Sequence, residues 1–506
     1  MDDLNRVMSD RLRKLETLVE AGANPYANGF APTATCAEVL KRAEAQTPPD
    51  MGGLDDVTEE HAVAGRVMAK NVMGKAMFLR IRDRSVGVGP EAPGTLQLYV
   101  RRDVIGEEAY RGLKALDIGD FIGVSGPLFV TRTGEATVFI RSGGLLTKSL
   151  RPLPEKFHGL SDVETRYRQR YVDLTMNPEV REVFITRSRI VRFMRRFLES
   201  QDFIEVETPM MHVIPGGATA RPFETHHNAL DMPLFMRVAP ELHLKRLVVG
   251  GLERVYELNR CFRNEGLSPK HNPEFTTVEF YQAYATYEDL MDLTEAMIRG
   301  MAEELSEDGD ATRPMGDLTV DYGADFARYT MVESLSAVAQ IPAEEAADRD
   351  ALLTRLRGAG YEDLPADLAY GHVLVRAFEE WVEPQLIQPT FITQHPIETS
   401  PLARRNEDNP DFTDRFELFI AGMEIANAFS ELNDPQDQRA RFEEQVAARD
   451  AGDKEAMFMD LDYVRALEIG LPPTAGEGIG VDRLVMLMTN RKTIREVILF
   501  PHMRPE

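Results

Sequence analysis

Alternation of apolar and polar residues predicts a strand-rich segment between residues 61 and 150. Its strand-like runs are HAVAGRVMA, AMFLRIRD, TLQLYVR, DFIGVSGPLFV and EATVFIR, and turn residues separate them. About five short strands at this regular spacing are typical of a small β-barrel. The Gly- and Pro-rich run SVGVGPEAPG, residues 85–94, has the character of an insertion between two of these strands.

The rest of the chain mixes helical and strand patterns without a βαβ rhythm, which indicates the α+β fold class. Residues 1–60 begin with a helical pattern and continue as an irregular extension. Residues 151–170 have the composition of a linker, and ITRSRIVRFMRRFLES then predicts an amphipathic helix. We therefore predict a large domain over residues 171–506, with an acidic helical insertion at about 300–380.

Length and composition are those of a soluble globular protein with more than one domain. The chain has 506 residues, of which 43% are hydrophobic and 28% charged. No run of 18 apolar residues occurs, so we expect no membrane span. The two cysteines, Cys36 and Cys261, provide neither a disulfide framework nor a cysteine zinc site. The charged N-terminus lacks the apolar core of a signal peptide, and we expect a cytoplasmic protein.

The formal net charge of −25 argues against nucleic-acid binding, but the distribution of charge changes that conclusion. Residues 61–150 carry 13 Lys and Arg against 8 Asp and Glu. A basic segment inside an acidic chain would localise the binding of a polyanion, although variation along the chain by chance explains the same numbers. With its predicted strands, this segment suggests an OB-fold that binds single-stranded nucleic acid.

The stretch FRNEGLSPKHNPEFTTVEFY, residues 262–281, combines a charged loop with a strand of bulky residues. Alternation places Phe275, Thr277, Glu279 and Tyr281 on one face of that strand. The preceding run VYELNRCFR also alternates, so the two runs predict a hairpin with a polar floor. Its basic groups suit a polyphosphate, and an aromatic ring could stack on a base. The alternative is a solvated hairpin face with internal ion pairs.

Three carboxylates, Glu241, Glu279 and Glu431, occur in otherwise bulky surroundings. Burial of an unpaired carboxylate is costly, so a cation is required. Either the protein's own Arg and Lys supply it, or a ligand with an ammonium group does. The glycine run GEGIG at 476–480 permits close approach of a ligand before Arg483, but it matches neither GxGxxG nor a Walker motif.

The FRNE loop, the HNPEFT strand and the GEGIGVDR run resemble motifs 2 and 3 of the class II aminoacyl-tRNA synthetases. FIEVETPMM, residues 203–211, resembles the dimer-forming motif 1 of that class. Within the class, the chain resembles the bacterial lysyl-tRNA synthetases over nearly its whole length. The phrases FHGLSDVETRYRQRYVDL, SPLARRN, FTDRFELF and NAFSELND carry this resemblance.

This resemblance implies a fold and an activity. The fold would be an N-terminal OB-fold barrel at 61–150 followed by a class II antiparallel sheet flanked by helices. The enzyme would activate L-lysine with ATP, release pyrophosphate and transfer lysine to the 3′ end of tRNA(Lys). It would act as a homodimer with Mg²⁺, and no residue would serve as a covalent nucleophile.

The resemblance also implies roles for individual residues. Arg263 and Arg483 would be the catalytic cations, with Arg263 on the α-phosphate and the lysine carboxylate. The other predicted ATP contacts are Glu265, His271, Asn272, Phe275 and Glu417, and magnesium would be held by Glu417 and Glu424. The lysine pocket would consist of Gly217, Glu241, Arg263, Glu279, Tyr281, Asn427, Phe429 and Glu431.

In the predicted OB-fold, the resemblance implies that an anticodon base stacks on an aromatic ring while polar groups recognise uridines. Phe78, Gln97 and Glu135 fall at the matching phrases, and Arg66 is a further candidate. Phe78 has an alternative role as a residue of the barrel core.

The chain departs from the family pattern at two positions near the site. Met423 stands where an arginine is usual, and Glu477 stands where an apolar residue is commoner. Strict alternation also puts Glu424 on the face opposite Asn427, and only a β-bulge would bring the two together. Three other functions would account for parts of the pattern: a lysine-activating paralogue that modifies a protein, a catalytically inactive RNA-binding regulator, and a free amino-acid ligase.

Overall fold

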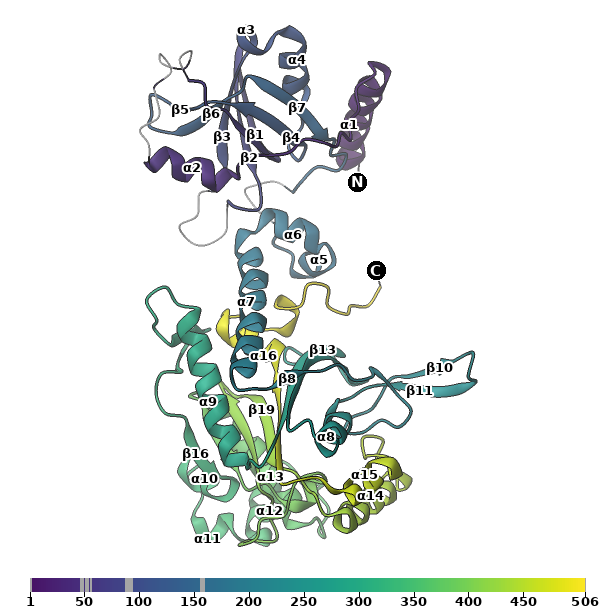
Figure 1. Ribbon diagram of the computed structural model, residues 1–506. Coiled ribbons are helices and arrows are strands. Elements are labelled where there is room, and N and C mark those ends of the chain that lie inside the picture. The colour runs from purple at the N-terminus through teal and green to yellow at the C-terminus, as the bar shows by residue number, and fades with distance from the viewer. Residues whose placement is uncertain are drawn as a thin grey trace. The chain divides into compact units, whose positions relative to one another are not determined.

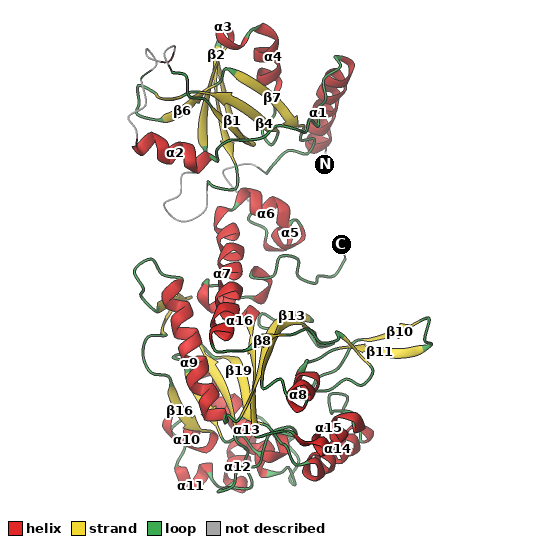
Figure 2. Cartoon of the chain, viewed as in Figure 1, coloured by secondary structure: helices red, strands yellow, loops and turns green. Residues whose placement is uncertain are grey.

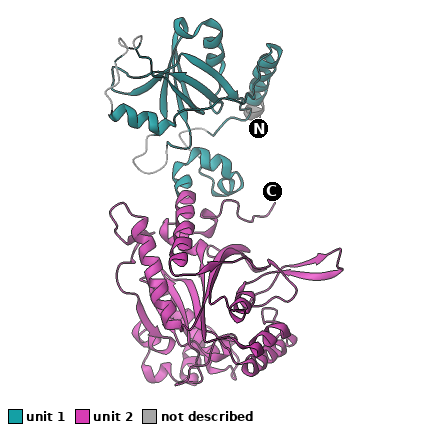
Figure 3. Ribbon diagram, viewed as in Figure 1, with its two compact units in different colours: residues 1–182 teal, residues 183–506 magenta. Residues whose placement is uncertain are grey.

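The computed structural model describes residues 2–45, 50, 54, 57–86, 94–154 and 160–505. Most of the predicted insertion at 85–94 and part of the predicted linker lie outside the described residues. The chain divides into two compact units, residues 1–182 and 183–506 (Figures 1 and 3). The four domain limits drawn from the sequence stay a prediction.

Unit 1 is built around a seven-stranded sheet with the order β5-β6-β3-β2-β1-β4-β7. The predicted strand runs are confirmed, because each contains a strand at its expected place. The strands are β1 (His61–Met73), β2 (Ala76–Arg82), β3 (Leu96–Arg101), β4 (Phe121–Gly126), β5 (Leu128–Val130), β6 (Ala136–Phe139) and β7 (Ser142–Thr147). The helices are α1 (Asp2–Glu20), α2 (Cys36–Ala45), α3 (Arg102–Ile105), α4 (Glu107–Ala115), α5 (Val163–Arg168) and α6 (Arg170–Met176).

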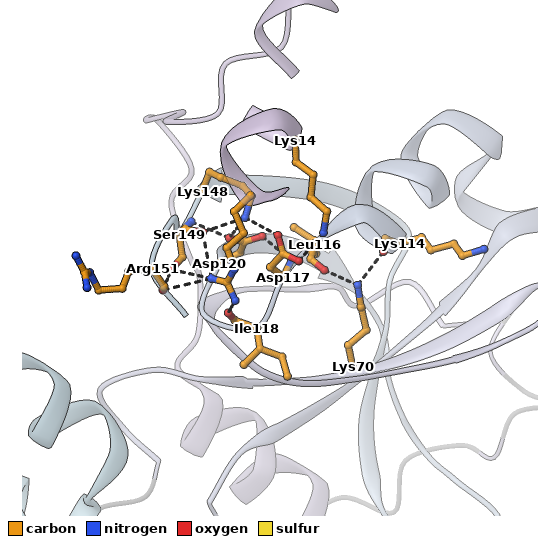
Figure 4. A network of polar contacts seen from close by, with 11 residues as sticks. Lys14, Lys70, Lys114, Leu116, Asp117, Ile118, Asp120, Lys148, Ser149 and Arg151 are labelled. Atoms are coloured by element: carbon orange, nitrogen blue, oxygen red, sulfur yellow. Dashed lines mark hydrogen bonds and ion pairs between the residues drawn. The ribbon is translucent and has the colours of Figure 1, made fainter. Parts of the chain in front are cut away.

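A buried polar network fixes α1 to the sheet of unit 1 (Figure 4). The Lys148 ammonium is buried and lies 2.8 Å from carboxylate oxygens of both Asp117 and Asp120. Lys14 of α1 reaches Asp117 at 2.5 Å, and Arg11 donates to the Ile118 carbonyl at 2.9 Å. Burial alone would raise the pKa of Asp117, but hydrogen bonds from Lys14 and Lys148 lower it below its usual value. The helix is therefore held by charge pairing as well as by packing.

Unit 2 is built around an eight-stranded sheet with the order β16-β17-β18-β19-β20-β13-β12-β8. Every neighbouring pair is antiparallel except β8–β12 and β16–β17 at the two edges. The strands are β8 (Ile204–Glu205), β12 (Arg254–Phe262), β13 (Glu274–Ala283), β16 (Ala327–Thr330), β17 (Thr390–Thr393), β18 (Arg415–Ile420), β19 (Met423–Ser430) and β20 (Thr474–Gly480). Smaller sheets consist of β9 (Met211–His212), β10 (Glu224–His227) and β11 (Met232–Met236), and of β14 (Thr312–Met315) and β15 (Leu318–Asp321).

Three helices cover one face of this sheet: α7 (Pro178–Ser200), α9 (Tyr287–Glu304) and α16 (Val481–Met488) (Figure 2). Their apolar stripes pack on the inward residues of the strands, such as Val278, Phe280 and Ile479, to form the largest core. The opposite face of the central strands carries the polar residues, and a second apolar cluster that includes residues of the C-terminal helices covers part of it. Further helices are α8 (Glu241–Val249), α10 (Met331–Ala337), α11 (Ala343–Ala346), α12 (Arg349–Gly358), α13 (Tyr370–Trp381), α14 (Pro435–Asp450) and α15 (Leu461–Gly470), with short 3₁₀ turns at Glu383–Gln385, Ile397–Thr399 and Ile494–Glu496.

The predicted hairpin is confirmed, and a β-bulge resolves the conflict over Glu424. Strands β12 and β13 pair so that Glu257 lies opposite Glu279. Between β18 and β19 the register shifts, because Leu418 lies opposite Ala426 while Phe419 lies opposite Glu424. The extra residue in β19 returns Glu424 to the face that also carries Glu417 and Asn427.

The two departures from the family pattern both point into the core. Met423 is only 3% exposed and packs among the apolar residues of the main cluster. Glu477 is buried, and both of its carboxylate oxygens lie within hydrogen-bonding distance, 2.6 and 2.7 Å, of the Thr294 hydroxyl on α9. Burial raises the pKa of Glu477 well above its usual value, because no cation compensates the charge.

We expect Glu477 to make the stability of unit 2 fall as pH rises. In the unfolded chain a Glu loses its proton near pH ~4.3, whereas the folded protein keeps it to higher pH, so folding is increasingly disfavoured above that value. The variant E477Q has no ionisable group at this position. Between pH 5 and pH 8 the thermal midpoint of the wild type should fall, and that of E477Q should fall by a few degrees less. The exposed E443Q is the matched control, and parallel pH curves for wild type and E477Q would contradict this assignment.

Candidate active site

A cavity of about 420 Å³ lies over the open face of the large sheet in unit 2. Most of the residues predicted for ATP, metal and lysine contacts line it: Gly217, Glu241, Arg263, Glu265, His271, Asn272, Phe275, Glu279, Tyr281, Glu417, Glu424, Asn427, Phe429 and Arg483. Glu431 is the exception, because it is buried behind the cavity wall. Strands and loops that are distant in sequence thus bring 14 of the predicted residues to one place.

The floor of the cavity is a grid in which glycines of β20 separate side chains of β13 and β19. Gly478 lies between Glu279 and Asn427, and Gly476 lies between Tyr281 and Phe429. A Cβ atom at Gly476 would overlap both the Tyr281 ring and the Glu431 carboxylate. Only glycine at this position lets the backbone pass beneath the two functional side chains.

One end of the cavity is cationic and rich in hydrogen-bond donors. The Arg263 guanidinium lies 5.1 Å from the centroid of the Phe275 ring. Arg483 donates to the backbone carbonyl of Glu424 at 2.6 Å and lies 2.9 Å from Nε2 of His271. Burial and the nearby Arg483 lower the pKa of His271, so its Nε2 accepts from the guanidinium. This end is suited to bind an anionic ligand beside an aromatic plane.

Arg415 is a site residue that sequence reasoning missed, although it lies within the quoted phrase FTDRFELF. It donates to Glu417 at 2.5 Å, to the Asn427 side chain at 3.1 Å and to the Ser400 hydroxyl at 2.9 Å. One guanidinium therefore orients two predicted ligand-binding side chains from neighbouring strands. Its periodicity in the strand would have put it on the same face as Glu417, which was the available signal.

The other end of the cavity is acidic and contains a cation that sequence reasoning also missed. Lys245, on α8, is fully buried and donates to Glu241 at 2.6 Å. Its ammonium also forms an ion pair with Glu431 and lies 5.2 Å from the centroid of the Phe429 ring. The spacing of Glu241 and Lys245, four residues apart in a predicted helix, was the available signal.

Glu279 is the third acid of this end, and among the described residues no Lys or Arg forms an ion pair with it. Its carboxylate accepts a hydrogen bond from the Tyr281 hydroxyl at 3.1 Å. Burial and the nearby Glu241 raise the pKa of Glu279 to about 8. Burial also raises the pKa of Glu241 and of Glu431. Burial by itself would lower the pKa of Lys245, but the two neighbouring acids outweigh that effect and raise it. Lys245 pairs with Glu241 and Glu431, so Glu279 keeps its proton to higher pH than a free carboxyl group does unless a cation binds beside it.

The residues predicted to contact an anticodon lie together in unit 1. Phe78 and Gln97 are on neighbouring strands β2 and β3, and Glu135 precedes β6. Arg80, which sequence reasoning did not single out, is ion-paired with Glu135 at 2.6 Å. The side chain of Arg66, the further candidate, donates to the Gly119 carbonyl at 3.0 Å and lies over the Phe121 ring, 4.2 Å from its centroid.

Comparison with known proteins identifies both units. Residues 162–504 match the family model of the class II tRNA synthetases for D, K and N, and residues 62–144 match the model of the OB-fold nucleic-acid-binding domain. The chain is 54% identical to a lysine–tRNA ligase of Thioalkalivibrio sulfidiphilus and 52% identical to one of Magnetococcus marinus, in each case over 99% of this chain and 98% of that protein. A lysine–tRNA ligase of Aromatoleum aromaticum is 53% identical over 100% of this chain and 98% of its own length.

The chain belongs to the lysine–tRNA ligase family. The predicted fold class is confirmed for this family member, because unit 1 contains the OB-fold domain and unit 2 the antiparallel sheet flanked by helices. The roles of the individual site residues stay predictions. Within the part of the chain that the structure describes, no helix is both long enough and apolar enough to cross a membrane.

We expect Lys245 to be required for the stability of unit 2 in this family member. The variant K245M leaves Glu241 and Glu431 buried without their cation, which costs about 3–5 kcal/mol when one partner of a buried pair is removed. The thermal midpoint should therefore drop, and it should drop more at pH 8 than at pH 6, where protonation relieves the acids. The double variant K245M/E431Q should recover part of the loss.

The exposed K454M is the matched control for the lost charge. If K245M unfolds at the same temperature as the wild type at both pH values, the prediction is wrong. The two acids would then be buried without needing the Lys245 ammonium.

Proposed function

We propose that the chain activates L-lysine with ATP to form lysyl-adenylate and pyrophosphate, and then transfers the lysyl group to the 3′ end of tRNA(Lys). The observation that carries this proposal is a single cavity with a cationic, aromatic end and an acidic end that lacks one cation. ATP and lysine have the complementary charges. The match of 99% of the chain to named lysine–tRNA ligases, including the OB-fold segment, disfavours a paralogue that resembles the catalytic domain alone.

At the cationic end, Phe275 would stack under the adenine ring with Arg483 on its other face. Glu265 would accept a hydrogen bond from the adenine amino group, while His271 and Asn272 would lie beside the phosphates. Arg263 would bind the α-phosphate and the lysine carboxylate together, because a guanidinium offers donors to two anions at once. Its Nε is buried without a hydrogen-bond partner inside the described chain, which leaves that donor for a ligand.

At the acidic end, charge balance accounts for the choice of lysine. Lys245 already engages Glu241 and Glu431, and Arg415 engages Glu417. Glu279 and Tyr281 are therefore the groups to which the side-chain ammonium of lysine would bind, with Asn427 and Phe429 as the facing wall. Gly217, where a Cβ atom would come within 3.0 Å of Glu241, would border the pocket. A neutral amino acid would leave Glu279 unpaired and is rejected for that reason.

Magnesium would be held by Glu417 and Glu424 against the ATP phosphates. The donor set fits, because both carboxylates line the cavity and carboxylate oxygens are the ligands that magnesium prefers. Glu417 forms an ion pair with Arg415 through one oxygen, and Glu424 does so with Arg483. Burial and the proximity of Glu417 and Glu424 also raise the pKa of Glu383, so a concentration of negative charge exists there for a cation to offset. Bound magnesium would neutralise phosphate charge.

The chemistry requires positioning and no nucleophile from the protein. An oxygen of the lysine carboxylate attacks the α-phosphorus of ATP, the bond to the bridging oxygen of the β-phosphate breaks, and pyrophosphate leaves. Arg263 would align the two anions that must approach each other and would offset their repulsion. Alignment of this kind together with preorganised charge accounts for large rate effects.

A homodimer in the cytoplasm, as for the bacterial family, is part of the proposal. The motif 1 segment exposes large apolar side chains, with Ile204 at 53% and Met211 at 54% exposure, and Val213 follows at 60%. Exposed apolar side chains of this kind, on β8, on β9 and directly after β9, are suited to be covered by a second copy. Light scattering, with 57.0 kDa expected for one chain, is the direct check.

Amino-acid-dependent exchange of pyrophosphate into ATP tests the activation step. We expect exchange with lysine in the absence of tRNA, and little with methionine, glutamine or arginine. R263Q should reduce exchange at least about 100-fold, because it removes a charge that acts in the transition state. R260Q, near the end of β12 and outside the cavity lining, is the matched control, because Arg263 follows directly after that strand. Strong exchange with another amino acid, or no exchange with ATP bound, would overturn the proposal.

The raised pKa of Glu279 predicts how lysine affinity depends on pH. At pH 7 a carboxyl group with a pKa of about 8 is mostly protonated, so a bound ammonium must displace that proton. Lysine affinity should therefore rise about fivefold from pH 7 to pH 8, with close to one proton released per lysine at pH 7. E279Q should bind lysine more weakly and with a flatter pH dependence. Calorimetry in two buffers of different ionisation enthalpy measures the proton count, and equal slopes for both proteins would refute the role of Glu279.

A further inference from the structure

The first turn of α16 is tied to β13 by a single carboxylate. The pairing of β13 with β20 ends where Thr277 lies opposite Gly480, and the chain then turns into α16. The backbone amide of Thr276, one residue earlier in β13, donates instead to Oδ2 of Asp482 at 2.7 Å. Both residues of this contact are buried. The Asp482 side chain therefore continues the contact with β13 after the partner strand has ended.

An arginine from a third element completes this contact. Nη1 of Arg187, on α7, lies 2.5 Å from Oδ1 of Asp482, and Nη2 donates to the Thr276 hydroxyl at 3.0 Å. Nη1 also donates to the carbonyl of Val497, the residue after the last 3₁₀ turn, at 3.2 Å. A planar fork of donors suits a guanidinium to several acceptors at once. One side chain of α7 thus holds β13, α16 and the C-terminal segment together.

The two anchored residues are direct neighbours of the proposed adenine contacts. Thr276 follows Phe275, and Asp482 precedes Arg483. Phe275 and Arg483 both line the cavity, but one belongs to a strand and the other to a helix. The separation of these two side chains therefore depends on how the start of α16 is held against β13. Asp482 and Arg187 hold the two backbones together one residue away from each side chain.

We propose that Arg187 and Asp482 are positioning residues for ATP, because they set the spacing between the Phe275 ring and the Arg483 guanidinium. This inference rests on the proposed function, in which the adenine ring lies between those two groups. A flat base needs about 3.5–4.0 Å to the plane on each side, and an extra gap of about 0.5–1 Å forfeits roughly a quarter to a half of the dispersion attraction. A small shift of α16 is therefore enough to weaken nucleotide binding.

A purely stabilising role for the same pair makes a different prediction. Removal of one partner of a buried ion pair destabilises a fold, whatever else the pair does. Lost stability alone would act on every ligand of the cavity, whereas altered spacing would act on ligands that carry the base. Inorganic tripolyphosphate has the phosphates of ATP without the adenine, so it distinguishes the two roles.

The test compares wild type with R187M, D482N and R196M in the full-length protein. D482N keeps an acceptor for the Thr276 amide but loses the charge that pairs with Arg187. R196M is the matched control, because it removes an ion pair of the same helix, with Glu304 on α9, outside the cavity lining. Calorimetry measures the binding of ATP and of tripolyphosphate, and pyrophosphate exchange gives KM for ATP and for lysine.

We expect R187M and D482N to weaken ATP binding roughly 10-fold, within the range that one stacked base contributes. The affinity for tripolyphosphate and the KM for lysine should stay at their wild-type values. In the F275L background, which removes the ring, D482N should cost much less, because changes that act on one shared interaction are not additive. R196M should behave as wild type in every measurement.

Four results would overturn the proposal: wild-type ATP binding by both variants, equal losses for ATP and tripolyphosphate, a rise in KM for lysine that matches the rise for ATP, or the same cost of D482N with and without the Phe275 ring. If R187M does not fold, D482N decides alone, since it keeps the hydrogen bond to β13. A wild-type protein that binds ATP but shows no lysine-dependent exchange would contradict the proposed function alone. The binding comparison would still decide the role of Arg187 and Asp482.

Discussion

The burial of two carboxylates, Glu241 and Glu431, against one ammonium is the constraint on which the rest of the site depends. Lys245 comes from the interior of α8 and meets Glu241 and Glu431, which belong to different parts of the chain. The helix, the end of β19 and the sheet can therefore pack closely only if this charge arrangement forms. Glu279, on the neighbouring strand β13, is left with the Tyr281 hydroxyl as its hydrogen-bond partner, and its pKa is raised to about 8. If lysine binds here as proposed, the charge arrangement that assembles the core also sets the selectivity for a cationic side chain.

The sheet separates this charge from the apolar core by alternation. Val278 and Phe280 face α7 and α9, while their neighbours Glu279 and Tyr281 face the cavity. The cavity face also needs glycine in β20. A side chain at Gly476 would fill the space that the Tyr281 ring and the Glu431 carboxylate occupy. One bulge between β18 and β19 then brings Glu424 to the face of Glu417 without disturbing the apolar residues beyond it.

Much of this could be predicted from the sequence, because strand alternation is strict where one face is buried. Alternation correctly predicts the face of the sheet that carries Phe275, Glu279, Asn427 and Phe429. It failed at Glu424, because a bulge leaves no clear mark in an apolar run. Lys245 and Arg415 were missed since each looks like an ordinary helix or strand residue until its partners from distant segments are known. Arg80 was missed for the same reason, and the burial of Glu431 behind Gly476 depends on packing that no local pattern contains.

The charge of the chain explains why short-range contacts matter in unit 1. A net charge of −25 repels the phosphates of a polyanion at long range, and the OB-fold segment carries only a small positive excess. Non-specific attraction is therefore weak, and a nucleic acid bound by the OB-fold domain must gain most of its binding free energy from short-range contacts with bases and sugars.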